Sequence, residues 1–263
     1  MATKKPKTRI IKNTFWALAE EFCCSDPGEL WDKLEYDGWL ENCKGALGKH
    51  VCKQGTPKQL DDLIQRGMTL HDDLVPFTGY TPLNLAIKHR NYPLVEHILG
   101  ELKFSPDGLA SSNSKDYTSS PKQALEVACQ LLRRRAVSVL LEHGASPTLR
   151  WNNPYEEAAG NGNITHTRQR MVIGIWDLLK KHGVPMDEEN TPWSLGHRVI
   201  ANNSMLLMDW LDKNNYEWRW ESERGKNLVE TTQDPELRAR LLAREMERRT
   251  LNNPKAASRS ARL

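Results

Sequence analysis

The chain has 263 residues, of which 38% are hydrophobic and 27% charged, and its formal net charge is +3. This composition is typical of a soluble folded protein, and no stretch approaches the roughly 20 apolar residues of a membrane-spanning helix. Residues 1–13 carry five positive charges and residues 250–263 carry three, which leaves residues 14–249 with a net charge of −5. A folded body of that sign argues against a nucleic-acid clamp.

Residues 1–13 are predicted to be a flexible basic arm. This arm lacks the long apolar run of a secretory signal. The five cysteines are an odd number without a CxxC pair, which favours reduced thiols. We therefore expect a cytoplasmic protein, and the alternatives are a nuclear location or delivery into a host cell.

Residues 14–39 contain two short amphipathic segments, which we expect to form a helical N-terminal cap. The alternative is a free amphipathic arm that binds a partner or a membrane. Helices that bind anionic lipid are basic, whereas this region is acidic, with Glu20, Glu21, Glu29 and Asp32 among its residues.

A pair of short apolar segments occurs twice in the middle of the chain. The first pair spans 79–86 and 94–99, and the second spans 124–128 and 137–145. Each segment has one apolar stripe at helical spacing, so a single pair of such helices cannot bury its apolar surface alone. Neighbouring pairs must therefore stack on one another, which predicts an array of helical repeats.

The first pair also carries specific helix-start signals. The hydroxyl of Thr81 can cap a helix whose first residue is Pro82, where a proline loses no needed N–H group. The whole pattern resembles the ankyrin repeat. It consists of a glycine, Thr-Pro-Leu, an alanine-centred first helix and a leucine-rich second helix that ends in Gly-Ala. Asn84 stands where that family usually has histidine. The resemblance implies an all-α ankyrin-repeat solenoid of helix-turn-helix units joined by short hairpin-like loops.

The resemblance covers residues 40–245 as about five to six units. The two clear copies are 42 residues apart instead of roughly 33, which predicts an insertion at 103–121. A second insertion is expected at 160–174, and residues 246–263 are predicted to be a flexible basic tail. Weaker copies lie at 56–67, 153–183, 191–211 and 225–242. The copy at 191–211 opens with Thr191-Pro192.

Nothing in the sequence predicts catalysis. The eight histidines lack metal-ligand spacing, so we interpret them as structural or surface residues. Residues 160–163, Gly-Asn-Gly-Asn, lack the Gly-Lys-Ser/Thr of a phosphate loop, and no nucleophile motif or pair of acids stands out. We therefore expect no enzyme activity, cofactor, metal ion or small-molecule substrate.

The resemblance implies that partners bind the repeat tips, the concave face and the inserted loops. Aromatic residues flanked by arginine are typical of interface hot spots. The alternative is that each tip tryptophan packs on the next hairpin, and Trp176, Trp193 and Trp210 are expected in the core. The candidate partner-binding residues at the tips are Phe77, Tyr80, Arg150, Trp151, Asn152, Trp218 and Trp220.

A basic edge is the second candidate surface. Arg133, Arg134 and Arg135 lie in an inter-helix turn, and stacking would align them with 88–90, 168–170 and 197–198. Such a stripe could dock an acidic partner or nucleic acid, and a solvated charged edge is the alternative.

From these residues we predict a protein-protein interaction module that inhibits or scaffolds another protein. The alternative is a nucleic-acid-associated protein that uses the basic edge and the basic tails. Salt dependence discriminates between them, because binding to phosphates weakens steeply as salt rises.

Overall fold

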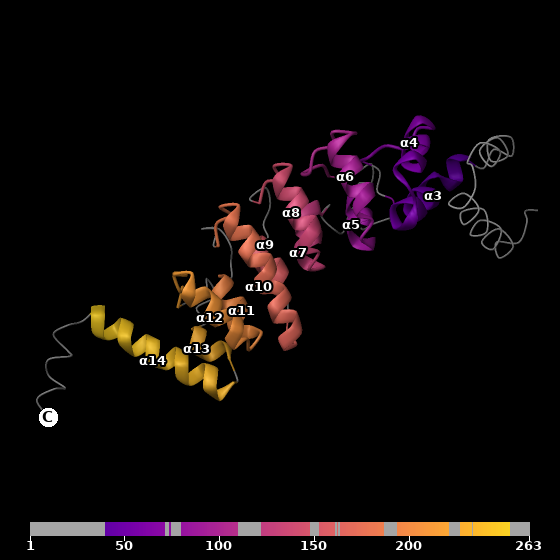
Figure 1. Ribbon diagram of the computed structural model, residues 1–263. Helices are drawn as coiled ribbons and strands as arrows, with labels where there is room; N and C mark the ends of the chain where they lie inside the picture. Colours follow the sequence, from indigo (N-terminus) through magenta and orange to yellow (C-terminus); the bar gives the residue numbers. More distant parts are fainter. Residues whose placement is uncertain are drawn as a thin grey trace, which may run out of the picture. The chain divides into compact units, whose positions relative to one another are not determined.

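The structure is a computed structural model. The chain divides into two compact units, Met1–Ser146 and Pro147–Leu263, and the described residues of each contain three pairs of helices (Figure 1). The expected arm and cap, and the residues Phe77, Arg150, Trp151, Asn152 and Trp193, lie outside the described residues. The described residues are 40–71, 74, 80–109, 122–147, 153–160, 162, 164–186, 194–220, 227–232 and 234–252.

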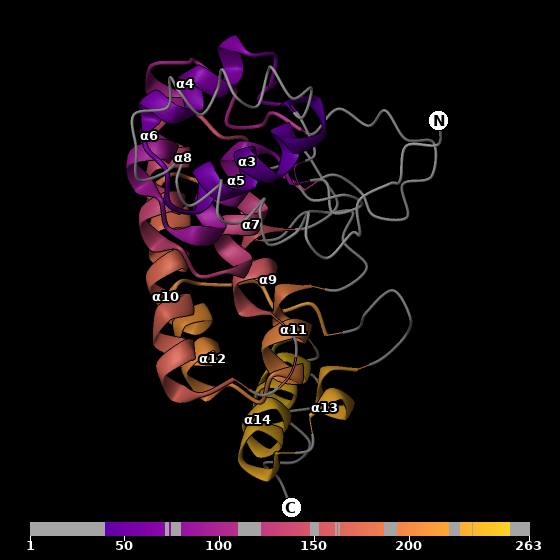
Figure 2. The same cartoon turned by 90° about the vertical axis from the view of Figure 1, so that its right-hand side faces the viewer.

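In unit 1, each helix pair consists of a first and a second helix that contact each other. Successive first helices also contact one another, and so do successive second helices, so that the two sets form separate columns (Figure 2). The pairs are α3 (Leu40–Gln54) with α4 (Pro57–Gln65), α5 (Pro82–His89) with α6 (Tyr92–Gly100), and α7 (Ala124–Gln130) with α8 (Arg134–Glu142).

In unit 2, the first helices likewise contact one another in chain order, and α10 contacts α12. The core contains Trp176 and Trp210, as predicted, with their ring centroids 5.0 Å apart. Tyr155 lies 6.0 Å from the Trp176 ring and completes an aromatic cluster. The pairs are α9 (Pro154–Ala159) with α10 (His166–Lys181), α11 (Leu195–Ala201) with α12 (Met205–Lys213), and α13 (Leu228–Thr231) with α14 (Pro235–Asn252).

Local chemistry explains where helices begin and end. The Thr81 hydroxyl accepts a hydrogen bond from the N–H of Asn84, and Pro82 is the first residue of α5, as the sequence predicts. Gly144 and Gly183, which follow the second helices α8 and α10, have φ values of 81° and 73°. A side chain would be strained in that left-handed conformation, so glycine is the residue that ends these helices at least cost.

Helix α11 begins later than the Thr191-Pro192 signal suggests. Ser194 is its N-cap, and the Ser194 hydroxyl accepts a hydrogen bond from the N–H of His197. His197 therefore occupies in α11 the position that Asn84 occupies in α5. The histidine that the resemblance to the ankyrin repeat implies at this helix position is therefore found in α11, three residues further along than the sequence signal indicated.

Parts of the two expected insertions and of the expected tail form regular structure. Within 103–121, the described part contains a turn at 105–108, and both carboxylate oxygens of Asp107 accept hydrogen bonds from the N–H of Ser146. Within 160–174, residues 166–174 form the first half of α10. The expected tail boundary at residue 246 falls inside α14, which continues to Asn252 because its sequence is rich in strong helix formers.

Side chains in the inter-helix turns of unit 1 hold successive pairs in register. Asn91 Nδ2 donates a hydrogen bond to the Gly55 carbonyl oxygen, just beyond α3, at 2.9 Å. The Arg133 guanidinium donates to the Lys88 carbonyl oxygen, in the last turn of α5, at 3.2 Å. The last carbonyls of a helix have no intrahelical donor, so each of these bonds caps the first helix of the preceding pair.

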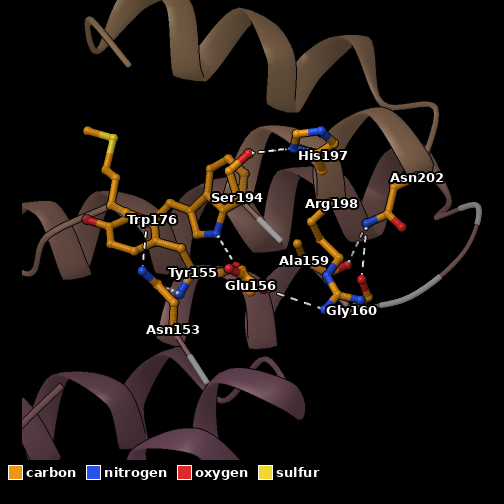
Figure 3. Close-up of polar contacts among 11 residues, drawn as sticks. Asn153, Tyr155, Glu156, Ala159, Gly160, Trp176, Ser194, His197, Arg198 and Asn202 are labelled. Atoms are coloured by element: carbon orange, nitrogen blue, oxygen red, sulfur yellow. Dashed lines mark hydrogen bonds and ion pairs between the residues drawn. The ribbon is translucent and has the colours of Figure 1, made fainter. Parts of the chain in front are cut away.

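Unit 2 repeats this arrangement. Asn202 Nδ2 donates to the carbonyl oxygens of Ala159 and Gly160, at the end of α9, at 3.2 Å and 3.3 Å (Figure 3). Nearby, Arg198 of α11 lies 3.5 Å from the Glu156 carboxylate of α9. The polar groups between these two helices therefore serve their stacking.

Candidate functional site

Basic side chains from three elements gather on one surface of unit 1. We call this surface the basic face. Four of its six members are exposed and two are half-buried. The members are Lys49 and Lys53 of α3, Lys88 and His89 of α5, Arg90 directly after α5, and Arg133 directly before α8.

The charges of the basic face act on His89 and Arg133. Burial lowers the pKa of His89, and the positive charges of Lys88, Lys53, Lys49 and Arg133 lower it further. Burial also lowers the pKa of Arg133, and the positive charge of Arg90 lowers it further. These effects show that the cationic groups lie close enough to raise the positive potential at one place.

No carboxylate neutralises the basic face within the part of the chain that the structure describes. None of its six side chains forms an ion pair with a described aspartate or glutamate. Exposed charges of one sign, left without partners, are a site for an anionic group from another molecule.

The three arginines of the predicted basic edge differ in their contacts. Arg133 caps α5 through the Lys88 carbonyl. Arg135 pairs with Glu96 at 2.7 Å and lies over the Tyr92 ring, 4.9 Å from its centroid. Arg134 is exposed. Arg134, the first residue of α8, is therefore the one of these three arginines whose side chain has no hydrogen bond, ion pair or ring contact in the described part of the chain.

Tyr80, a predicted partner-binding residue, lies beside the basic face. The Lys88 ammonium lies over the Tyr80 ring, 5.1 Å from its centroid. One face of the ring is therefore already occupied by a cation.

The sequence reasoning did not include Lys49 and Lys53. They are four residues apart and therefore lie on the same face of α3, and both are exposed. This spacing is visible in the sequence. Their proximity to Lys88 and His89 is not, because it depends on the packing of α3 against α5.

Trp218 is packed within unit 2. Its indole N–H donates to the Asp212 carboxylate at 3.1 Å, and its ring meets Tyr216 edge-on with the centroids 5.3 Å apart. The Arg244 guanidinium of α14 lies over the ring, 5.4 Å from its centroid. Trp218 therefore packs within the chain, as in the alternative interpretation of the tip tryptophans, and is not fully exposed.

Trp220 and Asp212 belong to the same joint between α14 and the preceding pair. Arg248 of α14 lies over the Trp220 ring at 5.2 Å. The Asp212 carboxylate pairs with Arg240 at 3.0 Å and also with Arg244. These contacts hold α14 against α12 and the residues that follow α12.

Two residues of the predicted basic stripe do not lie on an exposed edge. His197 is fully buried, and its Nδ1 lies 2.8 Å from the Ser194 hydroxyl oxygen at the start of α11 (Figure 3). Arg198 is directed to Glu156 of the preceding pair. Both side chains therefore contribute to stacking in unit 2.

Three other features bear on function: the Cys52 thiol, clusters of potential metal ligands and membrane-spanning helices. Burial raises the pKa of the Cys52 thiol well above its usual range. No group of three or more potential metal ligands occurs among the described residues. In the same part of the chain, no helix combines the length and the apolar character that a bilayer crossing requires.

Comparisons with known proteins place the chain by its fold. No family model matches the sequence, and no curated protein matches it. Among solved structures, the ankyrin repeat domain of Bcl-3, a member of the IkappaB protein family, matches with a TM-score of 0.57 and 17% identity, covering 86% of this chain and 96% of that one. The human ASB11 ankyrin repeat domain matches with a TM-score of 0.43 and 19% identity, covering 75% and 96%. The match to the Bcl-3 domain confirms the predicted fold: this chain has the all-helical ankyrin-repeat fold.

Proposed function

We propose that this chain is a protein-binding module that holds another protein on the exposed surface of its helix pairs and thereby inhibits or scaffolds it. The ankyrin-repeat fold carries the proposal, because this fold generally serves protein interaction and is typically non-catalytic. The hydrogen bonds between successive pairs support it further. They hold the turns in place before a partner arrives, so that little conformational entropy is lost on binding.

The test is capture of a partner followed by reconstitution with purified components. The full chain, immobilised at low density, is exposed to a lysate of its native cell, and each retained protein is then purified and titrated against the chain by calorimetry. We expect at least one protein to bind directly with a defined stoichiometry. If every purified candidate shows no heat of binding and no shift in size-exclusion chromatography, the proposed function is wrong.

The basic face also supports the alternative of nucleic-acid association. Phosphate contacts would make such binding steeply dependent on salt between about 50 mM and about 200 mM. A gel-retardation assay with DNA and RNA at the lower salt concentration tests it. The absence of any retarded band removes this alternative, since low salt is where phosphate binding is strongest.

A further inference from the structure

The basic face of unit 1 has positive charge on successive repeats and no acidic partner in the described chain. Lys49 and Lys53 lie on α3, Lys88 and His89 on α5, and Arg133 at the start of α8. These positions follow the stacking direction of the helix pairs, because α3 contacts α5 and α6 contacts α8. A ligand that crosses the repeats would therefore meet cationic groups at each step.

From this geometry we infer that the basic face binds an extended acidic segment of the partner protein, with carboxylates about three residues apart. The inference rests on the proposed function and names the chemistry of the partner.

The spacing follows from packing geometry. Packed helices have axes about 8–10 Å apart, so the cationic groups of successive helix pairs recur at about that interval. A segment in the extended polyproline II conformation rises about 3.1 Å per residue with three residues per turn, so every third side chain lies on the same side at intervals of about 9–10 Å. A segment with an acidic side chain at every third position would place one carboxylate beside each repeat.

One observation favours a polypeptide over nucleic acid. Binding of single strands combines cationic grooves with free aromatic faces on which bases stack. Among the described residues, Tyr80 and Tyr92 lie near the basic face, and each already has one ring face covered by a cation, from Lys88 and Arg135.

His89 provides an internal reporter of occupancy. The positive charges around it lower its pKa in the unoccupied protein. A bound carboxylate would offset those charges, so the pKa of His89 should rise when the basic face is filled. Histidine resonances, assigned with the His89→Gln variant, report this change without reference to any cellular partner.

The probe is a fluorescein-labelled peptide with glutamate at every third position, and binding to the full chain is measured by fluorescence anisotropy. Its control is the same peptide with glutamine in place of glutamate, and single-stranded DNA of equal charge is the competing class of ligand. The test variant is Lys53→Ala/Lys88→Ala, which removes two exposed charges of the basic face. The matched control is Lys58→Ala/Lys181→Ala, which removes two exposed charges elsewhere.

We expect the glutamate peptide to bind and the glutamine peptide not to bind. The basic-face variant should weaken binding roughly three- to tenfold, while the control variant changes it less than about twofold. Raising salt from about 50 mM to about 200 mM should weaken binding, because the charges are exposed. Binding should also raise the pKa of His89.

Four results would overturn the inference. One is no binding of the glutamate peptide at low salt, and another is equal loss in the two double variants. The third is that the DNA binds more tightly than the peptide and that Lys53→Ala/Lys88→Ala weakens DNA binding. This result would assign the basic face to nucleic acid. A purified protein partner whose affinity is unchanged by Lys53→Ala/Lys88→Ala would also refute it, while leaving the proposed function intact.

Discussion

Replacing Asn202 by alanine should lower the free energy of unfolding of unit 2 by about 1–2 kcal/mol. The Asn202 side chain is 2% exposed and donates to the carbonyl oxygens of Ala159 and Gly160 at 3.2 Å and 3.3 Å. These carbonyls lie at the end of α9, a helix of six residues, where no intrahelical donor is available. Alanine would remove both N–H donors and leave the buried Ala159 carbonyl and the part-buried Gly160 carbonyl without them.

The magnitude combines opposing contributions. A neutral hydrogen bond contributes a net ~1 kcal/mol, and buried acceptors without donors cost about 1–3 kcal/mol. Against this, Asn202 Oδ1 is itself buried without a partner in the described part of the chain, so its removal recovers part of the loss. The balance is a moderate destabilisation, smaller than that of a core cavity.

The Asn202→Asp variant separates hydrogen bonding from packing. Aspartate has nearly the same shape, but its carboxylate can only accept, and it would face two carbonyl oxygens. It should therefore destabilise at least as much as alanine. Lys213→Ala, at an exposed position of α12, is the control for an ordinary surface change.

Urea denaturation followed by far-UV circular dichroism measures the change in stability. Hydrogen exchange of peptides that cover α9 and α11 localises it to unit 2. If Asn202→Asp unfolds at the same urea concentration as the unchanged chain, the donors do not hold the two pairs in register and the reasoning fails.

Three further predictions concern the core, a thiol and the terminal helix. Leu140→Ala should cost about 2–5 kcal/mol, because Leu140 is fully buried in α8; an unchanged melting curve would contradict its place in the core. Cys52, whose pKa is raised by burial, should react with a thiol reagent only after urea is added, and rapid reaction of a Cys52-only variant in native buffer would refute this. Asp212→Ala should loosen α14 by removing a carboxylate that Arg240 and Arg244 share, while Arg240 keeps Asp209; trypsin should then cut α14 faster, and unchanged cleavage would count against this joint.

The repeat pattern was predictable because its signals are local. Thr81, Pro82 and Gly144 act within one turn of their own positions, as a cap, a helix start and a helix stop. The apolar stripes of α5 and α8 also depend only on spacing within each helix. The ankyrin-repeat fold could therefore be expected from residues in short windows.

The start of α11 was harder to predict, because the sequence offers two start signals close together. Thr191-Pro192 has the usual residue types, but Ser194 caps the helix and His197 packs against it. A local signal cannot say which of two caps agrees with the stacking of α11 on α9. That choice depends on contacts such as the one between Asn202 and Ala159, which are 43 residues apart.

The candidate surfaces show the same division. The arginines at 133–135 were visible as a charged turn, yet their separate contacts with Lys88 and Glu96 were not. The sequence left open whether Trp218 is an exposed tip residue or packs within the chain, and only the structure shows its contacts with Asp212 and Arg244.

The sequence by itself determined the helix pairs, their caps and the need to stack, because each follows from side chains a few positions apart. Only the tertiary structure determined which charges lack an acidic partner among the described residues. Lys53, Lys88 and Arg133 come from three separate elements and act together at His89 because the pairs stack. Electrostatic interaction depends on distance in space, and in this fold residues about forty positions apart become neighbours.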